Sequence, residues 1–111
     1  MKIIEDLTKS TTMQVIIHAP WEVNEYMKDL INRKSNKLLK YESHIQKIDV
    51  FLKNGEGENI ADKNVEVRLK TNYAEFFAQN TAKDLEAALA DAMAKVKRQV
   101  IKRKEKLQSH H

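Results

Sequence analysis

The C-terminal stretch, residues 81–107, restricts the possible folds of this chain more than any other segment. Apolar side chains recur in it at three- and four-residue steps, including Leu85, Leu89, Val96 and Val100, which is typical of an amphipathic helix. We expect Thr81 to cap this helix, with Asp84 three residues later in a capping-box arrangement. At 1.5 Å per residue the helix is about 40 Å long, and its single apolar stripe must pack on another layer of structure.

The charge of this helix is concentrated in its second half. From Lys95 to Leu107 there are seven Lys or Arg residues and one Glu, a local charge of +6 in a chain whose net charge is +4. The rest of the chain therefore sums to −2. Complementing the helix dipole is worth only about 0.3–1 kcal/mol and fades within one turn, so it does not explain three turns of positive charge. A polyanion such as nucleic acid is the first partner that this pattern predicts.

The remaining elements follow from apolar periodicity. Asn24 is expected to cap a helix that runs to about Lys40, and Trp21 is expected in the core. Strands are expected at residues 13–18, 45–53, 65–70 and 73–79, with a hairpin loop at 54–63. The order is β-α-β-β-β-α, an α+β fold with two helices packed on one face of a four-stranded sheet. The opposite face should be wet and should carry Glu66, Arg68 and Lys70.

These patterns predict one domain at residues 13–107, an N-terminal extension at 1–12 and a tail at 108–111. The chain has no Cys, no Gly-rich phosphate loop, no nucleophile elbow and no grouped metal ligands. We therefore expect no enzyme, no metal, no cofactor and no small-molecule substrate. The polar start of the chain does not resemble a signal peptide, and no apolar run approaches the length of a membrane span. A cytoplasmic protein without a membrane partner is the simplest interpretation.

Two rows of cations are the candidate binding residues. Lys95, Arg98 and Lys102 share one face of the last helix, and Lys34, Lys37 and Lys40 share one side of the first helix. If the helices pack side by side, the two rows form one positive surface. Secondary contacts are assigned to Arg33, Arg103, Lys104 and Lys106. Few side chains suited to reading bases are present, and the sheet is expected to lack paired aromatics because one of Phe76 and Phe77 must face the core. Recognition of phosphate and shape, and so of structured RNA, is favoured.

The same residues resemble a known family, the ribosome hibernation-promoting factors, also called ribosome-associated inhibitors or sigma-54 modulation proteins. In the last helix Lys95, Arg98, Gln99, Val100 and Lys102 are similar to the family's K-x-x-R-Q-hydrophobic-x-K core. The segment KSNKLLKY, residues 34–41, is similar to its K-x-x-K-L-x-K-aromatic ending of the first helix. The strand at residues 62–70 also fits, and the resemblance extends from Met13 to about Lys106.

The resemblance implies a protein that binds the small ribosomal subunit in the channel used by tRNA and mRNA. Such proteins block translation and protect ribosomes in resting or stressed cells. The residues implied to contact the rRNA backbone are the same six that the charge pattern selects: Lys34, Lys37, Lys40, Lys95, Arg98 and Lys102. The chain resembles a short form of the family. Ribosome pairing, which a further domain performs in long forms, would then require a second protein.

Two alternatives stay open at this point. One is a protein-interaction module, either transcription-modulating or helix-pairing, in which the seam from Leu85 to Leu107 packs against another helix. The other is a generic domain for structured RNA. The order of the strands is similar to that of double-stranded-RNA-binding modules, although theirs is α-β-β-β-α.

Overall fold

The computed structural model describes residues 13–55 and 61–108. In chain order its elements are β1 (Gln14–His18), α1 (Glu25–Leu38), β2 (Ile45–Asn54), β3 (Lys63–Thr71), β4 (Glu75–Ala82) and α2 (Leu85–Gln108). The predicted α+β class and the order β-α-β-β-β-α are confirmed. The extension predicted at residues 1–12 lies outside the described residues, as do residues 56–60 of the predicted loop and 109–111 of the predicted tail.

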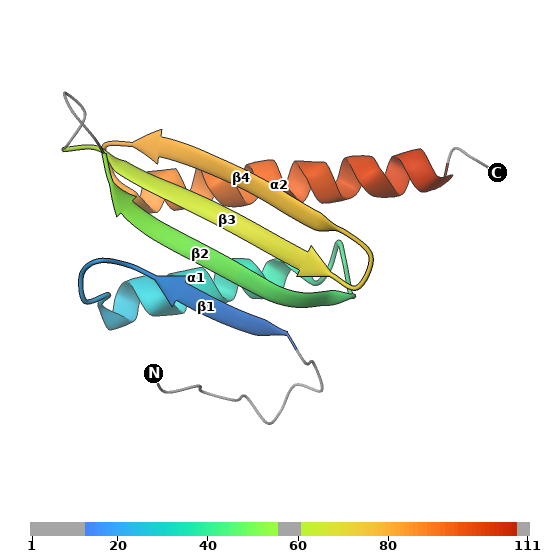
Figure 1. Ribbon diagram of the computed structural model, residues 1–111, viewed down its shortest axis with the longest axis horizontal. Helices are drawn as coiled ribbons and strands as arrows, with labels where there is room; N and C mark the ends of the chain where they lie inside the picture. Colours follow the sequence, from blue (N-terminus) through green and yellow to red (C-terminus); the bar gives the residue numbers. More distant parts are fainter. Residues whose placement is uncertain (1–12, 56–60, 109–111) are drawn as a thin grey trace.

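The four strands form one mixed sheet in the order β1-β2-β3-β4. Strand β1 pairs with β2 in parallel, so α1 is the crossover that joins them, whereas β3 is antiparallel to both β2 and β4. The C-terminal ends of strands β1, β2 and β4 consequently lie at the same end of the sheet, and each helix starts from that end. The two helices therefore run in the same direction over one face of the sheet, and the other face is left open (Figure 1).

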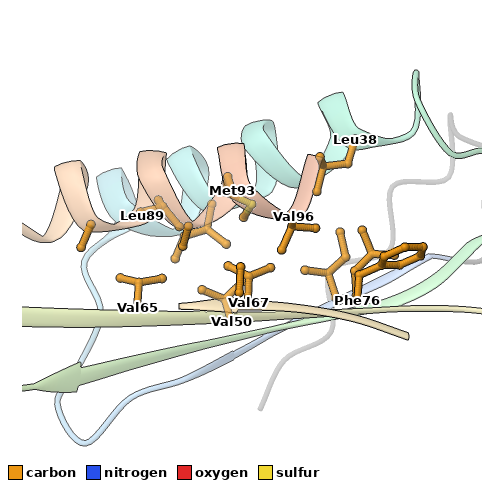
Figure 2. Packing of buried hydrophobic residues seen from close by; sticks show 14 of the residues in the cluster. Leu38, Val50, Val65, Val67, Phe76, Leu89, Met93 and Val96 are labelled. Carbon is orange, nitrogen blue, oxygen red and sulfur yellow. The ribbon is translucent and has the colours of Figure 1, made fainter. Parts of the chain in front are cut away.

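The core lies between the sheet and the two helices. Alternate residues of the strands point toward the helices, as Val65, Val67 and Leu69 of β3 illustrate, and each of these is buried. Figure 2 shows how the two layers meet, with helix residues Leu38, Leu89, Met93 and Val96 facing sheet residues Val50, Val65, Val67 and Phe76. Full burial of one such side chain stabilises the fold by about 1.5–3 kcal/mol. The core therefore holds the helices at fixed positions on the sheet.

The predicted cap of the first helix is confirmed, but that of the second is wrong. The side chain of Asn24 accepts a hydrogen bond of 2.8 Å from the backbone N–H of Met27. Thr81, in contrast, lies inside β4, where its hydroxyl accepts a bond of 2.8 Å from the Asn64 amide. Pairing between β3 and β4 continues to Ala82, so the helix begins later, and Asp84 accepts from the N–H of Glu86 at 3.1 Å.

The fourth strand also begins later than predicted. The Thr71 hydroxyl accepts hydrogen bonds from the backbone N–H groups of Tyr73 and Ala74, at 3.2 and 2.9 Å, and this closes a turn. The strand therefore starts at Glu75 instead of Tyr73. At the other end of the sheet Trp21, expected in the core, is half-buried and packs against the margin of the core.

The open face of the sheet departs from the sequence prediction in two ways. Glu66 is only 6% exposed, because Lys53 and Arg68 cover its carboxylate from neighbouring positions. Arg68 and Lys70 are exposed, as expected. Phe76 and Phe77 do not pair on one face, as expected, but Phe51 and Phe77 both stand on the open face, and the Arg68 guanidinium between them lies against both rings. Phe76 alone of the β4 phenylalanines enters the core.

The last two turns of α2 extend beyond the end of the sheet (Figure 1). Val100 is the last buried residue of this helix, and Leu107 is 54% exposed. The upstream part of the apolar seam, including Leu89, Val96 and Val100, is buried in the core of this chain. That part is therefore not open to a second helix.

Candidate nucleic-acid interface

The basic halves of the two helices lie at the same end of the molecule, because the helices run in the same direction (Figure 1). The opposite end is acidic, with Glu25 in the first turn of α1 and Glu86 in the first turn of α2. We call the basic region the basic end and define it by these residues: Lys34, Lys37, Lys40, Lys97, Arg98 and Lys102. The topology thus brings together two rows that are about 60 residues apart in the sequence.

A groove between α1 and α2 forms the centre of the basic end. Its volume is about 190 Å³, and it is lined by Lys34, Lys37, Leu38, Tyr41, Ala90, Met93, Ala94 and Lys97. The short side chains of Ala90 and Ala94 leave room between the helices. The Lys97 ammonium lies 4.5 Å from the centre of the Tyr41 ring, a cation–π contact. The groove therefore has mainly apolar walls, with the side chains of three lysines along it.

The predicted row on α2 (Lys95, Arg98 and Lys102) keeps to one side of the helix, and Lys97 lies on the other side. A helix turns about 100° per residue, so Lys95 and Lys97 lie on opposite sides of Val96, which faces the sheet. Lys97 is on the side of α1, whereas Lys95 faces β4, where its ammonium donates to the carbonyl of Gln79 at 3.2 Å and to Asn80 Oδ1 at 2.9 Å. The structure thus joins Lys97, and not Lys95, to the row on α1.

Arg98 and Lys102 are exposed and make no ion pair among the residues that the structure describes. Lys37 and Lys40 are also exposed, and Lys34 is half-buried beside the groove. Sequence reasoning did not select Lys97 as a site residue. Its position next to Val96, on the side opposite Lys95, is the signal that could have identified it.

The secondary residues have different surroundings. Arg33 forms an ion pair of 2.8 Å with Asp29, one turn earlier in α1, so its charge already has a partner. The Arg103 guanidinium lies 5.1 Å from the centre of the Tyr73 ring, in the turn before β4. Lys104 and Lys106 are exposed on the projecting end of α2. Among these four, Lys104 and Lys106 are the better placed to extend the basic end.

Lys95 and Gln99 also protect the free edge of the sheet. The Gln99 amide donates to the Phe77 carbonyl at 2.6 Å and accepts from the Phe77 N–H at 3.2 Å. Together with the Lys95 contact to Gln79, these bonds occupy the backbone groups that an edge strand otherwise presents to another chain. The Gln of the predicted helix motif thus has a structural role in this molecule.

A buried carboxylate fixes the loop after α1 to the turn before β4. Glu42 is 1% exposed and accepts hydrogen bonds from the Tyr73 hydroxyl and from the backbone N–H of His44, the latter at 2.7 Å. Burial acts to raise the pKa of Glu42, but the bonds from Tyr73 and His44 outweigh it and hold that pKa below its ordinary value. The charge of Lys104 acts in the same direction. The ionised carboxylate therefore helps to order the region under the projecting end of α2.

Two further properties of the described residues bear on function. Among residues 13–55 and 61–108, no three His, Asp or Glu side chains are grouped so that they could hold a metal ion. Within the same ranges, neither helix has the length and apolar character that a membrane crossing requires.

Comparison with known proteins gives matches over most of the chain. The family described as sigma 54 modulation protein / S30EA ribosomal protein matches residues 14–108. A relative from Klebsiella oxytoca, a ribosome hibernation promoting factor, is 32% identical over 89 residues, which are 80% of this chain and 90% of the relative.

Two solved structures share the fold. The N-terminal domain of Protein Y from Thermus thermophilus superposes with a TM-score of 0.69 at 17% identity, over 83% of this chain and 98% of that domain. A ribosomal subunit interface protein from Coxiella burnetii superposes with a TM-score of 0.67, also at 17% identity, over 82% of this chain and 97% of the other.

Proposed function

Because the chain belongs to the sigma 54 modulation protein / S30EA ribosomal protein family, we propose that it is a ribosome-binding translation inhibitor. It docks the basic end on the rRNA of the small subunit, occupies the channel that tRNA and mRNA use, and promotes ribosome hibernation in the cytoplasm of stressed or resting cells. It acts by occupancy, without catalytic turnover. A second protein is the partner for any pairing of ribosomes.

The observation that carries this proposal is the convergence of cations from both helices at one end. Each Lys or Arg that neutralises a phosphate releases condensed counterions, and such contacts supply most of the sequence-independent affinity for nucleic acid. Phosphate contacts also fix the orientation of the bound protein. A rigid pair of helices, held by a shared core, presents these charges at fixed spacing. Structured rRNA is a ligand that has phosphates at fixed spacing too.

We assign the main rRNA contacts to Lys34, Lys37, Lys40, Lys95, Arg98 and Lys102, and we add Lys97 because it lines the groove between the helices. Lys95 contributes charge from the side of β4 while its ammonium binds that strand. Arg33, Arg103, Lys104 and Lys106 are secondary contacts. Of these, Arg33 is expected to contribute least, since Asp29 already neutralises it.

Co-sedimentation through sucrose tests the proposal. The protein should be retained on small subunits and on whole ribosomes, and mRNA with tRNA should displace it. The double variant Arg98→Glu/Lys102→Glu should lose retention at moderate salt, with thermal stability nearly unchanged because both side chains are exposed.

The matched control is Lys28→Glu/Lys83→Glu. It changes the net charge by the same amount at exposed positions, but at the acidic end of the helices. This control should still be retained on ribosomes. Equal loss in both double variants would show that net charge alone governs binding, and retention of the Arg98/Lys102 variant would refute the assigned site. Equal binding of naked duplex RNA by the wild-type protein would leave only a generic domain for structured RNA.

A further inference from the structure

The open face of the sheet carries a row of planar groups that crosses all four strands. We call it the aromatic row and define it by His18 on β1, Phe51 on β2, Arg68 on β3 and Phe77 on β4. The rings of His18 and Phe51 stack with centroids 4.3 Å apart and 9° between their planes. The Arg68 guanidinium lies 5.3 Å from the centre of the Phe51 ring and 5.6 Å from that of Phe77. The four groups thus form a continuous row of contacts, one ring stack and two cation–π contacts.

Two carboxylates hold this row in place. Glu66 accepts from Arg68 Nε at 2.7 Å and from Lys53 Nζ at 3.2 Å. On the other side, His18 Nε2 lies 2.9 Å from Asp49 Oδ1, and Lys47 Nζ lies 3.4 Å from the second oxygen of Asp49. Each carboxylate thus has two basic partners, so neither presents an unbalanced negative charge. The Arg68 guanidinium and the His18 ring are therefore oriented before any ligand binds.

The aromatic row is exposed to solvent, and its Phe77 ring is not part of the hydrophobic core. Phe77 is 47% exposed, while its neighbour Phe76 fills the core. Arg68 is 61% exposed in its side chain. A single exposed apolar side chain is common on protein surfaces, but this ring lies beside the Arg68 guanidinium, and the backbone edge next to it is already occupied by Gln99. Strand pairing with a second copy at this edge is therefore blocked, and the Phe77 ring is the part of this region that a ligand can reach.

Cations beside the row indicate the charge of the ligand. Lys47 and Lys70 are direct partners across β2 and β3, and both point to the open face. Like charges opposite each other in a sheet are destabilising. Asp49 forms an ion pair with Lys47, whereas Glu75, the register partner of Lys70 in β4, forms no ion pair with it among the described residues. An anionic group between them would remove this repulsion.

We propose that the open face of the sheet is a second RNA site, which takes unpaired bases of a single strand. The bases stack on the exposed ring of Phe77 and on the adjoining plane of Arg68, and backbone phosphates lie at Lys47 and Lys70. Aromatic rings combined with cations in this way recognise single strands, because every base has a face that can stack. This site differs from the basic end in position, since it lies on the opposite side of the sheet. It differs in ligand too, since the basic end reads phosphates of folded RNA.

Fluorescence anisotropy with a labelled ten-nucleotide oligo(U) tests the proposal, with a ten-base-pair RNA duplex for comparison. Phe77→Ala should weaken oligo(U) binding about tenfold, within the range known for loss of one stacked base. Lys70→Glu should weaken oligo(U) binding and should reduce the slope of log K against log salt concentration by about one. Tyr26→Ala is the matched control, because Tyr26 is 56% exposed on α1, away from this face, and it should bind as the wild type does.

A second measurement needs no substitution. Adding oligo(U) to the isotopically labelled protein should shift the NMR amide signals of Arg68 and Phe77, with little change at Lys37 and Lys97. Shifts confined to the helices, no response to oligo(U), or equal affinity of wild type and Phe77→Ala would each overturn the proposal.

The two proposals fail separately. Arg98→Glu/Lys102→Glu, which should lose ribosomes, should bind oligo(U) as well as the charge-matched Lys28→Glu/Lys83→Glu variant does. Loss of oligo(U) binding only in the former would assign single strands to the basic end and overturn the second site. If the wild-type protein binds oligo(U) but does not bind ribosomes, only the function proposed for the basic end is refuted.

Discussion

Replacement of Tyr73 by Phe isolates the hydrogen bond that stabilises the buried Glu42 carboxylate. The change removes one hydroxyl and leaves the ring under Arg103 in place. Hydrogen bonds to charged groups contribute about 1.5–3 kcal/mol, and an unsatisfied buried partner raises the cost. We therefore expect the free energy of unfolding to fall by about 1.5–3 kcal/mol at pH 7. Since 1 kcal/mol corresponds to about 4–8 °C in a domain of this size, Tm should fall by at least about 6 °C.

Urea denaturation followed by circular dichroism measures this difference. Tyr26→Phe is the matched control, because it removes the same hydroxyl from a carboxylate, Glu86, at a distance of 3.0 Å on an exposed surface. That loss should be much smaller than the loss at Tyr73, as is usual at exposed sites. Equal effects of the two substitutions would refute the reasoning, since burial of Glu42 is what distinguishes them.

Acid pH gives an independent check of the same bond. The folded-state pKa of Glu42 lies below its ordinary value, so its contribution to stability is present above the unfolded value of about 4.3 and is lost as the pH falls through the folded value. The Tyr73→Phe variant retains less of this contribution. The difference in unfolding free energy between variant and wild type should therefore narrow below about pH 4. A constant difference from pH 7 to pH 3 would show that the hydroxyl acts through packing alone.

Two further predictions concern the caps and the sheet edge. Asp84→Ala should lower the free energy of unfolding by about 1 kcal/mol, because it removes the side chain that caps α2. Thr81→Ala should lower it by less than half of that in thermal denaturation. A larger effect of Thr81→Ala would show that Thr81 is the cap, as first expected from the sequence. Gln99→Ala should cost about 1–2 kcal/mol because it removes both bonds to the backbone of Phe77, and sedimentation velocity should show concentration-dependent association through the uncovered edge. A monomer over the whole concentration range would mean that Lys95 alone is enough to protect that edge.

The elements themselves were predictable because their signals are local. Alternation of Val65, Val67 and Leu69 identifies β3, and the Asn24 cap with a stripe of apolar residues identifies α1. The start of α2 was not predictable from the Thr81 to Asp84 spacing. That spacing satisfies a local rule, but pairing with β3, a contact distant in sequence, keeps Thr81 in a strand.

The site residues also divide into those that local spacing predicts and those that depend on contacts distant in sequence. Spacing along each helix selected Lys34, Lys37 and Arg98, because three- and four-residue steps define a helix face. The place of Lys97 depends on how α2 is rotated on the sheet and on which side α1 lies. The aromatic row depends on register, which brings Phe51 and Phe77 to opposite sides of Arg68 from strands that are not adjacent. Tertiary contacts of this kind leave no periodic signal in the sequence.

The shared direction of α1 and α2 has a consequence for the rate at which this protein finds a partner. With acidic first turns at one end and cations at the other, the molecule carries a large permanent electric dipole. In the field of a polyanion a dipole experiences a torque, which turns the leading end toward the source before collision. Correctly oriented encounters then become more frequent, and electrostatic steering of this kind raises association rates by factors of about 10–1000 at low ionic strength. The parallel arrangement of the two helices thus also orients the protein during its diffusion toward a polyanion.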